Sequence, residues 1–280
     1  MAAAMAIINF GDFDKMQKYF GANLERAKKL DNYLVNTSIS DFMLEVMPSC
    51  HEFFENKCWW MNHYFNCCSL FELQKTEYGF CYTFNSELSE RNNMGIGNYD
   101  HGEGPDNLRP YRTSTAGRWG GLKFTINLPP EQIPPIMKDF IPGIVIVVSS
   151  PYDFPITGSD VPAVGSVQVV LSAEVTKATS QVQSLPPARR KCMYHDEGPQ
   201  LGFPEYRHAN CRAQCHRASA YQYCNCTPYF FPNEDIFNYD KPQPDNPFFY
   251  DGQQGISCFC SEDCNRMEYT SDIYAVPVLK

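Results

Sequence analysis

The sequence lacks an apolar run long enough to cross a membrane as a helix. A spanning helix needs about 20 predominantly apolar residues, whereas the best apolar run here covers only residues 143–148 (GIVIVV). The first residues, MAAAMAIINFGDFDK, also lack the basic start and the long apolar segment of a secretory signal peptide. The sequence as given therefore predicts neither a transmembrane helix nor a signal peptide.

Catalytic motifs are missing as well. The chain contains no GxSxG, HExxH or P-loop pattern. Cys215 and His216 are adjacent, and neighbours on a helix point about 100° apart, so they do not form a nucleophile pair. The paired acids Glu262 and Asp263 are interpreted as a solvated turn. We therefore predict that the protein is not an enzyme and has no catalytic residues, no metal and no cofactor.

Positive charge is in short supply. The chain has 23 Lys and Arg against 32 Asp and Glu, which gives a formal net charge of −9. Proteins that bind nucleic acid or an anionic membrane surface usually carry a basic patch. The charge balance therefore argues against nucleic acid as a partner.

Cysteine, by contrast, is abundant, and thirteen cysteines in 280 residues indicate an oxidising compartment. Two sequons, at Asn36 and Asn225, are candidate glycosylation sites there. The cysteines indicate export although the sequence shows no export signal. We therefore expect the sequence to be part of a longer protein or an incomplete gene model.

The cysteines of the last third predict a ladder of disulfides. Residues 206–221 are rich in Ala, Arg and Gln and free of Gly and Pro, which predicts a helix. Cys211 and Cys215 would lie on one face of it, about 6 Å apart along the axis. Cys258 and Cys260 would lie about 6.6 Å apart on one face of an extended segment. Because the two spacings match, we predict two stacked rungs, Cys215–Cys258 and Cys211–Cys260, and an outer rung, Cys192–Cys264, would close the ladder.

Zinc binding is the alternative use of these residues. The possible ligands are His208, Cys211, Cys215, His216, Cys224 and Cys226. The usual Cys-x2-Cys pairs of zinc sites are absent, and the spacings are one and three instead. Disulfides are therefore favoured, while an intracellular zinc protein stays open as a different class of function.

The rest of the chain predicts an α+β architecture. Helical spacing of apolar residues covers residues 12–35, and Ser40 can cap a second helix over residues 41–46. Residues 50–85 are dense in cysteine and aromatics, and residues 86–120 are polar and glycine-rich, typical of a loop. Three strands are expected at residues 122–128 (half-buried), 143–148 (buried on both faces) and 167–175. No long helices separate the strands, so an antiparallel sheet is favoured.

Several motifs together resemble a known family. They are, in order, PSC…KCWW…NCCSLFELQKTEYGFCYTFN, GLKFTINL, GIVIVVSSPYDFP, SLPPARRKC, NCRAQC…YCNCTPYFFP and CFCSEDCNRMEYTSDIY. They resemble the degenerin/epithelial sodium channel superfamily, and most of all its insect pickpocket branch. The stretch YGFCYTFN and the terminal Cys-x-Cys-x3-Cys are the most specific of them.

The resemblance implies the extracellular sensing domain of an amiloride-sensitive sodium channel subunit at the plasma membrane. It implies a homo- or hetero-trimer that passes sodium ions as the full-length assembly, with an unknown extracellular ligand. The family ectodomain is a clenched hand, so residues 1–120 would be a finger-like part, 121–185 a palm and β-ball sheet, and 186–280 a disulfide-laddered thumb with a return strand. Cys58–Cys67 resembles the bridge of the family's finger.

The sequence departs from the family pattern at both ends and in the thumb. Both membrane helices are absent, which predicts a truncated form. The early ectodomain cysteine that pairs with the counterpart of Cys81 in the family is not present upstream in this sequence, and the two thumb cysteines expected between Cys226 and Cys258 are missing. The partners of five cysteines therefore stay open: Cys50, Cys68, Cys81, Cys224 and Cys226. A secreted disulfide-rich binding module that reuses the same ectodomain fold is the alternative function.

Overall fold

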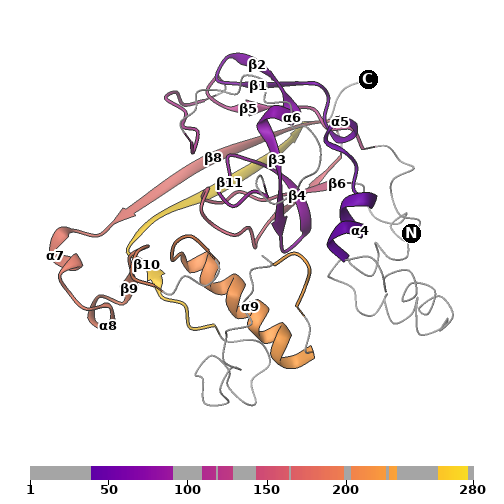
Figure 1. Ribbon diagram of the computed structural model, residues 1–280. Helices are drawn as coiled ribbons and strands as arrows, with labels where there is room; N and C mark the ends of the chain where they lie inside the picture. The colour runs from indigo at the N-terminus through magenta and orange to yellow at the C-terminus, as the bar shows by residue number, and fades with distance from the viewer. Residues whose placement is uncertain are drawn as a thin grey trace. The chain divides into compact units, whose positions relative to one another are not determined.

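The computed structural model describes residues 39–90, 109–117, 119–128, 143–163, 165–198, 203–224, 227–231 and 258–276 (Figure 1). The chain divides into two compact units, Met1–Ile144 and Val145–Lys280. Both combine helices with small β-sheets, so the predicted α+β class is confirmed. The helix expected over residues 12–35 lies outside the described residues.

The described residues of the first unit form three short helices and two small sheets. Strand β1 pairs antiparallel with both β2 and β5, and β3 pairs antiparallel with β4. Met61 and Asn62 join β1 to β2 with positive φ angles of 46° and 65°, as a tight hairpin turn requires. The elements are α4 (Ile39–Val46), α5 (Cys50–Phe53), β1 (Lys57–Trp60), β2 (His63–Asn66), α6 (Cys67–Leu70), β3 (Phe71–Thr76), β4 (Gly79–Phe84) and β5 (Leu122–Lys123).

Two expectations about this unit need correction. Helix α4 begins at Ile39, so Ser40 lies inside its first turn and does not cap it. The strand expected over residues 122–128 is reduced to β5 and an isolated bridge between Phe54 and Ile126. The chain changes partner on the way, because β5 pairs with β1 whereas Asn127 donates a 2.7 Å hydrogen bond to the Phe53 carbonyl.

A cluster of buried aromatic, aliphatic and cysteine side chains forms the core of the first unit. The rings of Phe54 and Phe71 stack with their centroids 4.3 Å apart. The partly buried side chains of Tyr82, Phe84 and Leu122 pack against the cluster. Its fully packed members are Phe54, Cys58, Trp60, Cys67, Leu70 and Phe71.

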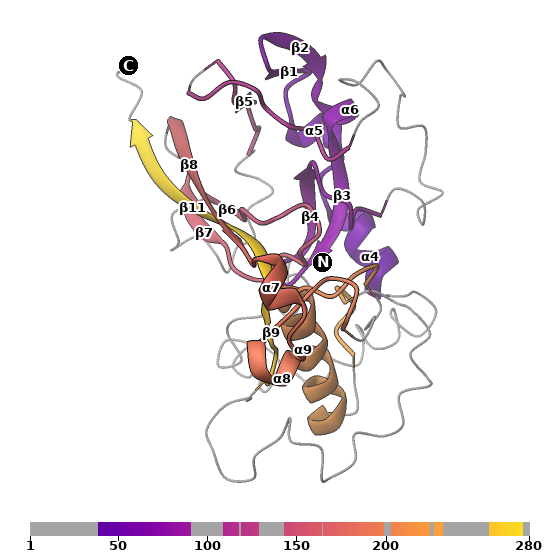
Figure 2. The same cartoon turned by 90° about the vertical axis from the view of Figure 1, so that its left-hand side faces the viewer.

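The second unit is organised around one helix and one long ribbon. Strands β8 and β11 pair antiparallel over twelve residues each, and Figures 1 and 2 show them side by side along their length. Strand β9 pairs with β10 in parallel. The elements are β6 (Gly143–Ile146, which spans the division), β7 (Ser159–Pro162), β8 (Ser166–Lys177), α7 (Ser180–Gln183), α8 (Pro187–Arg190), β9 (Cys192–Met193), α9 (His208–Cys224), β10 (Glu262–Asp263) and β11 (Asn265–Val276).

Strands are present at both positions predicted in this unit, but one of them is less buried than expected. The predicted strand at 167–175 is the central part of β8. The expectation that residues 143–148 are buried on both faces is wrong, since β6 alternates between exposed and half-buried residues and Val145 is 37% exposed. The reason is that β6 belongs to a sheet of two strands, β6 and β7, and not to the centre of a larger sheet.

Candidate functional site: a disulfide-braced helix

The predicted helix at residues 206–221 is present as α9, and two disulfides attach one face of it to an extended segment. Cys211–Cys260 has a Cα–Cα distance of 5.8 Å and Cys215–Cys258 one of 5.9 Å. The near-equal distances follow from the spacing, because one helical turn advances about as far as two extended residues. The helix and the segment are therefore joined at two levels and cannot rotate against each other.

The outer disulfide, Cys192–Cys264, closes the ladder beyond the start of the helix, with a Cα–Cα distance of 5.0 Å. The short parallel pairing of β9 with β10 brings its two ends together, and Cys264 donates a backbone hydrogen bond of 2.9 Å to the Met193 carbonyl. The structure thus contains the three rungs that the cysteine spacing predicts.

A single strand continues from the ladder. Cys264 is followed directly by Asn265, the first residue of β11, and β11 then pairs with β8 as far as Val276. The Asn265 side chain accepts a 3.0 Å hydrogen bond from the Ala178 backbone N–H just after β8 ends. The disulfides and the chain therefore connect α9 covalently to the β8–β11 ribbon.

Asn210 ties α9 to the turn of the PYDFP motif. Its side chain is 2% exposed, its Oδ1 accepts from the Phe154 N–H at 2.7 Å, and its Nδ2 donates to the Tyr152 carbonyl at 3.0 Å. Both polar atoms are thereby satisfied, which a buried amide requires. Phe154 itself stacks on Phe231 with a centroid distance of 5.8 Å. The turn and the helix therefore form one packed piece.

Two carboxyl groups are held in this piece with altered acidity. Burial raises the pKa of Asp153 to about 6; the nearby Arg207 opposes that rise, while Asp263 and Glu205 add to it. Burial also raises the pKa of Asp263, against the effect of the 3.1 Å hydrogen bond that it accepts from the His208 N–H. Carboxyl groups that resist ionisation this way carry a latent dependence on pH.

The position of Asp263 corrects an expectation from the sequence. The pair Glu262–Asp263 is not a solvated turn, because it forms β10, and only Glu262 is exposed. The pairing with β9 brings the half-buried Asp263 to the first residue of α9. Glu262 instead forms a surface ion pair with Arg266 at 3.0 Å, and its carboxylate lies 4.0 Å from His208 Nε2.

Tyr206 fastens the segment before α9 to Ser261, the residue just before β10. Its ring is buried, and its hydroxyl donates a 2.7 Å hydrogen bond to the Ser261 carbonyl. Burial raises the pKa of this hydroxyl to about 12, so it stays protonated. Any side chain at Gly198 would overlap the Tyr206 ring, which explains the glycine there.

Arg190 organises the approach to the outer rung. Its guanidinium is only 2% exposed; it donates to the carbonyls of Cys192 at 3.0 Å and Leu185 at 2.8 Å and forms an ion pair with Glu197. The ring of Tyr194 lies 4.8 Å from it. The residue belongs to the SLPPARRKC motif, but nothing in the sequence distinguishes it from its neighbour Arg189, which is exposed.

Two local disulfides staple the first unit. Cys58–Cys67 is present with a Cα–Cα distance of 4.8 Å, and Cys50–Cys68, whose partners the sequence leaves open, is joined at 5.8 Å. Cys67 and Cys68 both belong to the one-turn helix α6, so their side chains leave it in different directions. One turn of helix thereby serves two disulfides.

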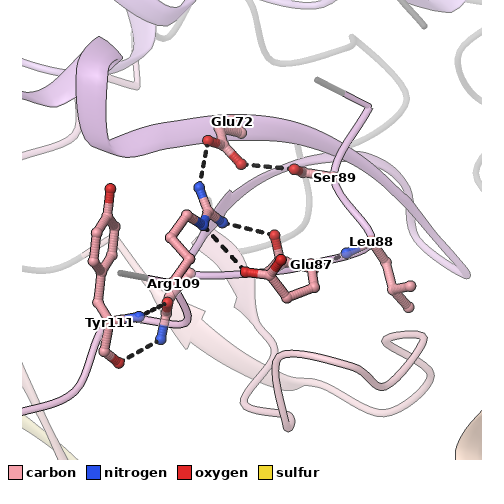
Figure 3. Close-up of polar contacts among 8 residues, drawn as sticks. Glu72, Glu87, Leu88, Ser89, Arg109 and Tyr111 are labelled. Atoms are coloured by element: carbon pink, nitrogen blue, oxygen red, sulfur yellow. Dashed lines mark hydrogen bonds and ion pairs between the residues drawn. The ribbon is translucent and has the colours of Figure 1, made fainter. Parts of the chain in front are cut away.

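Polar contacts of Arg109 hold residues 109–111 to β3 and to the residues that follow β4. Arg109 donates to Glu72 at 2.8 Å, to Glu87 at 3.2 Å and to the Ser86 carbonyl at 2.8 Å, as Figure 3 shows. Beside it, the Asn85 side chain donates to the Tyr111 carbonyl at 3.0 Å and accepts from the Tyr111 N–H. Arg109 is thus the first unit's counterpart of Arg190.

Cys81 is a free cysteine, and burial raises the pKa of its thiol. It lies 3.3 Å from the Thr76 hydroxyl and opposite Gln74, whose buried amide has no hydrogen-bond partner among the described residues. Asn36, Asn225, Cys226 and the side chain of Cys224 lie outside the described residues. Their predicted roles stay predictions.

The described residues contain no group of three or more His, Cys, Asp or Glu side chains placed to hold a metal ion. Two ligands of the zinc alternative, Cys211 and Cys215, are joined to Cys260 and Cys258 as disulfides. Neither can serve as a thiolate ligand in this state.

The pattern of a protein family matches almost the whole sequence. The family is described as "ASC: Amiloride-sensitive sodium channel", and the match covers residues 5–278. The chain belongs to the amiloride-sensitive sodium channel family. The recognition made from the cysteine and aromatic motifs is therefore confirmed, and the family is one of ion channels and not of enzymes.

Curated relatives agree with the family. "Pickpocket protein 19" of Drosophila melanogaster is 27% identical over 301 residues, covering 96% of this chain and 55% of that protein. "Sodium channel protein Nach" of Drosophila melanogaster is 21% identical over 276 residues, covering 94% and 51%. Its counterpart from Drosophila virilis is 24% identical over 254 residues, covering 86% and 60%. The chain spans about half the length of the curated relatives it matches.

Within the part of the chain that the structure describes, no helix is both long and apolar enough to span a lipid bilayer.

Proposed function

We propose that this chain is the extracellular region of an amiloride-sensitive sodium channel subunit that works as a trimer at the plasma membrane. The region would turn an extracellular stimulus into movement at its C-terminal strand. The observation that carries the proposal is the covalent path from α9 through the ladder into β11. Membership of the family supports the channel part of it.

The ladder suits the transmission of movement because it prevents α9 from sliding or rotating against the neighbouring segment. A helix held to a neighbour only by apolar contacts can slide or rotate by small repacking steps. Cys211–Cys260 and Cys215–Cys258 prevent both, and Asn210 adds a third attachment on the helix. A force applied to α9 therefore moves Cys264 and β11 with it, and is not absorbed by local repacking.

The three parts of the clenched hand are proposed on the same basis. The braced helix and the return strand fall in the proposed thumb, residues 186–280. The finger and palm boundary is proposed near the start of β6, because β5 pairs with β1 and a boundary after residue 120 would divide that sheet. Strands β6, β7 and β8 would then form the palm and β-ball region.

A chimeric channel tests the proposal. Residues 5–278 would replace the matching region of Drosophila pickpocket protein 19, and sodium current and amiloride block would be recorded in oocytes. We expect an amiloride-blocked inward sodium current and three photobleaching steps per surface complex. In a Cys211→Ser, Cys260→Ser version, we expect surface delivery to persist and gating to change. A chimera that reaches the surface and passes no sodium current would contradict the channel assignment.

A further inference from the structure

The sheet of β2, β1 and β5 has two faces of opposite character. Residues directly opposite one another on paired strands share a face, so Cys58 and Trp60 point with Leu122 toward the core. The other face carries Lys57, Trp59, Tyr64, Asn66 and Lys123, since Trp59 lies opposite both Tyr64 and Lys123 and Lys57 lies opposite Asn66.

Large aromatic side chains stand on that other face without joining the core. Tyr64 is 75% exposed and Trp119 is 71% exposed, and neither belongs to the buried cluster or to the side chains packed against it. Trp119 contacts Trp59 edge to face, with ring centroids 6.2 Å apart and planes at 62°. Aromatic groups left in water on one face usually mark an interaction surface.

The loop that carries Trp119 is built to place it. Gly117 has a φ of +83°, a conformation that favours glycine, and the Gly120 N–H donates to its carbonyl at 3.1 Å. A side chain at Gly120 would overlap the Thr115 carbonyl oxygen, and the Thr113 hydroxyl also donates to that oxygen at 2.9 Å. The turn therefore holds Trp119 against Trp59 through backbone contacts and not by burial of its ring.

The charge of this face is opposite to that of the chain. The formal net charge is −9, yet the residues that the three strands place here are neutral or basic, and Lys57 and Lys123 are both exposed. Neither lysine forms an ion pair with any residue that the structure describes. We call Lys57, Trp59, Tyr64, Trp119 and Lys123 the aromatic–lysine face.

We propose that the aromatic–lysine face docks an acidic, extended polypeptide segment of an extracellular partner. Carboxylates of the segment pair with the two lysines, and its apolar side chains cover Trp119 and Tyr64, residue types that dominate binding energy at interfaces. The two indoles cross at 62° and so present no single flat surface on which successive sugar rings could stack, which favours a polypeptide over a glycan. The proposal is independent of channel activity.

Peptide binding to the full 280-residue chain, with its disulfides formed, tests the proposal. The probes are three fluorescent synthetic peptides that share leucines and tyrosines and differ at the other positions, which are Glu and Asp, or Gln and Asn, or Lys. Fluorescence anisotropy should show saturable binding of the acidic peptide, binding about tenfold weaker or worse for the amide peptide, and none for the basic one. Rising salt should weaken the acidic complex, because the lysines are exposed.

Surface variants locate the binding. Trp119→Ala and Tyr64→Ala should each weaken the acidic peptide by about tenfold, and Lys57→Glu with Lys123→Glu should abolish its binding. Tyr274→Ala and Lys177→Glu, which alter exposed residues on the β8–β11 ribbon, are the matched controls and should bind normally. Circular dichroism checks that each variant is folded.

Other outcomes overturn the proposal. No saturable binding of the acidic peptide, or equal binding by Trp119→Ala, removes the acidic segment as occupant. Binding of a sulfated oligosaccharide but not of the peptide identifies a glycan site in its place. Self-association of the chain that is lost in Trp119→Ala, without peptide binding, identifies a second copy as the occupant.

Discussion

The two units of this protein use disulfides in different ways. In the first unit they span 18 and 9 residues and accompany a packed aromatic cluster. In the second unit they span 72, 49 and 43 residues: two join α9 to residues 258–260, and the third joins β9 to the residue before β11. The first pair thus fastens residues that the local fold already brings together, whereas the second set defines which distant segments meet.

Loop entropy shows how large the difference is. In the chain-entropy relation, a disulfide that closes a loop of 9 residues adds about 2.6 kcal/mol to the free energy of unfolding, and one that closes a loop of 72 residues adds about 4.4 kcal/mol. The second unit also exposes much of its longest sheet, including Leu171 and Val175. We infer that the second unit depends on its disulfides more than the first does.

The largest expected effect separates the two units directly. Cys192→Ala with Cys264→Ala should destabilise the second unit by about 4 kcal/mol, and Cys50→Ala with Cys68→Ala should destabilise the first by about 3 kcal/mol. All three tryptophans, Trp59, Trp60 and Trp119, belong to the first unit. Guanidinium unfolding followed by tryptophan fluorescence therefore reports the first unit, while far-UV circular dichroism also reports α9.

We expect the first double variant to lower the dichroism midpoint and to leave the fluorescence midpoint unchanged. The second double variant should lower the fluorescence midpoint. If both midpoints shift together in both variants, the two units unfold as one, and the claim that they depend differently on their disulfides is wrong.

Arg190→Ala should give the next largest effect, about 3 kcal/mol in the second unit. The Arg190 side chain is only 2% exposed, and its loss removes a packed side chain, the donor to the Cys192 and Leu185 carbonyls and the partner of Glu197. The dichroism midpoint measures it. Arg189→Ala is the matched control, since Arg189 is the adjacent exposed arginine and should change stability little. Equal effects of the two variants would show that burial of Arg190 is not what matters.

Arg109→Ala should cost about 2–3 kcal/mol in the first unit, because Glu72, Glu87 and the Ser86 carbonyl lose a shared donor. The side chain is 14% exposed, so water compensates more than at Arg190. The tryptophan fluorescence midpoint is the measurement, with exposed Arg112→Ala as control. A shift of the dichroism midpoint alone would show that Arg109→Ala destabilises the second unit, which would contradict the prediction.

Asp153→Asn should give the smallest effect, and it should stabilise. The pKa of Asp153 is raised from 3.8 to about 6 in the folded protein, so the folded state binds the proton more tightly than the unfolded state does. Its favourable contribution is complete below about pH 4 and is lost as the pH rises through about 6. The amide removes this loss, so the variant should be more stable than the parent by about 1–2 kcal/mol at neutral pH and about equal to it below pH 4.

Dichroism midpoints measured across the acidic range check this prediction. Asp160, which is exposed in β7, offers Asp160→Asn as the control, and it should show no comparable gain. A constant difference between Asp153→Asn and the parent at every pH would show that the titration of Asp153 is not its cause.

Sequence reasoning succeeds where geometry is local. The cysteine ladder can be predicted because the spacing within a helix and within an extended segment is set by the backbone alone. Strand β8 can be predicted from its alternation for the same reason. Cys50–Cys68 cannot, because the choice between adjacent Cys67 and Cys68 depends on where the single turn of α6 begins.

The rest depends on contacts between distant segments. Arginines are usually exposed, so the burial of Arg109 and Arg190 follows only once the loops supply carbonyls and carboxylates around them. Asp263 is similar, since its pairing with β9 and its contact with His208 join segments 55 or more residues apart. The shift of residues 122–128 from one partner to another also has no local signal, because alternation is the same whichever strand lies alongside.

The outer rung also determines where the long ribbon can come apart. Lys177 and Asn265 face each other at one end of it, and the chain from Lys177 runs through α7 and α8 to Cys192, which is bonded to Cys264. That end is a closed covalent ring, whereas none of the disulfides among the described residues closes the other end, at Ser166 and Val276. Fraying therefore starts at Ser166 and Val276 and progresses toward the ring, so amide hydrogen exchange along β11 should slow steadily from Val276 to Asn265.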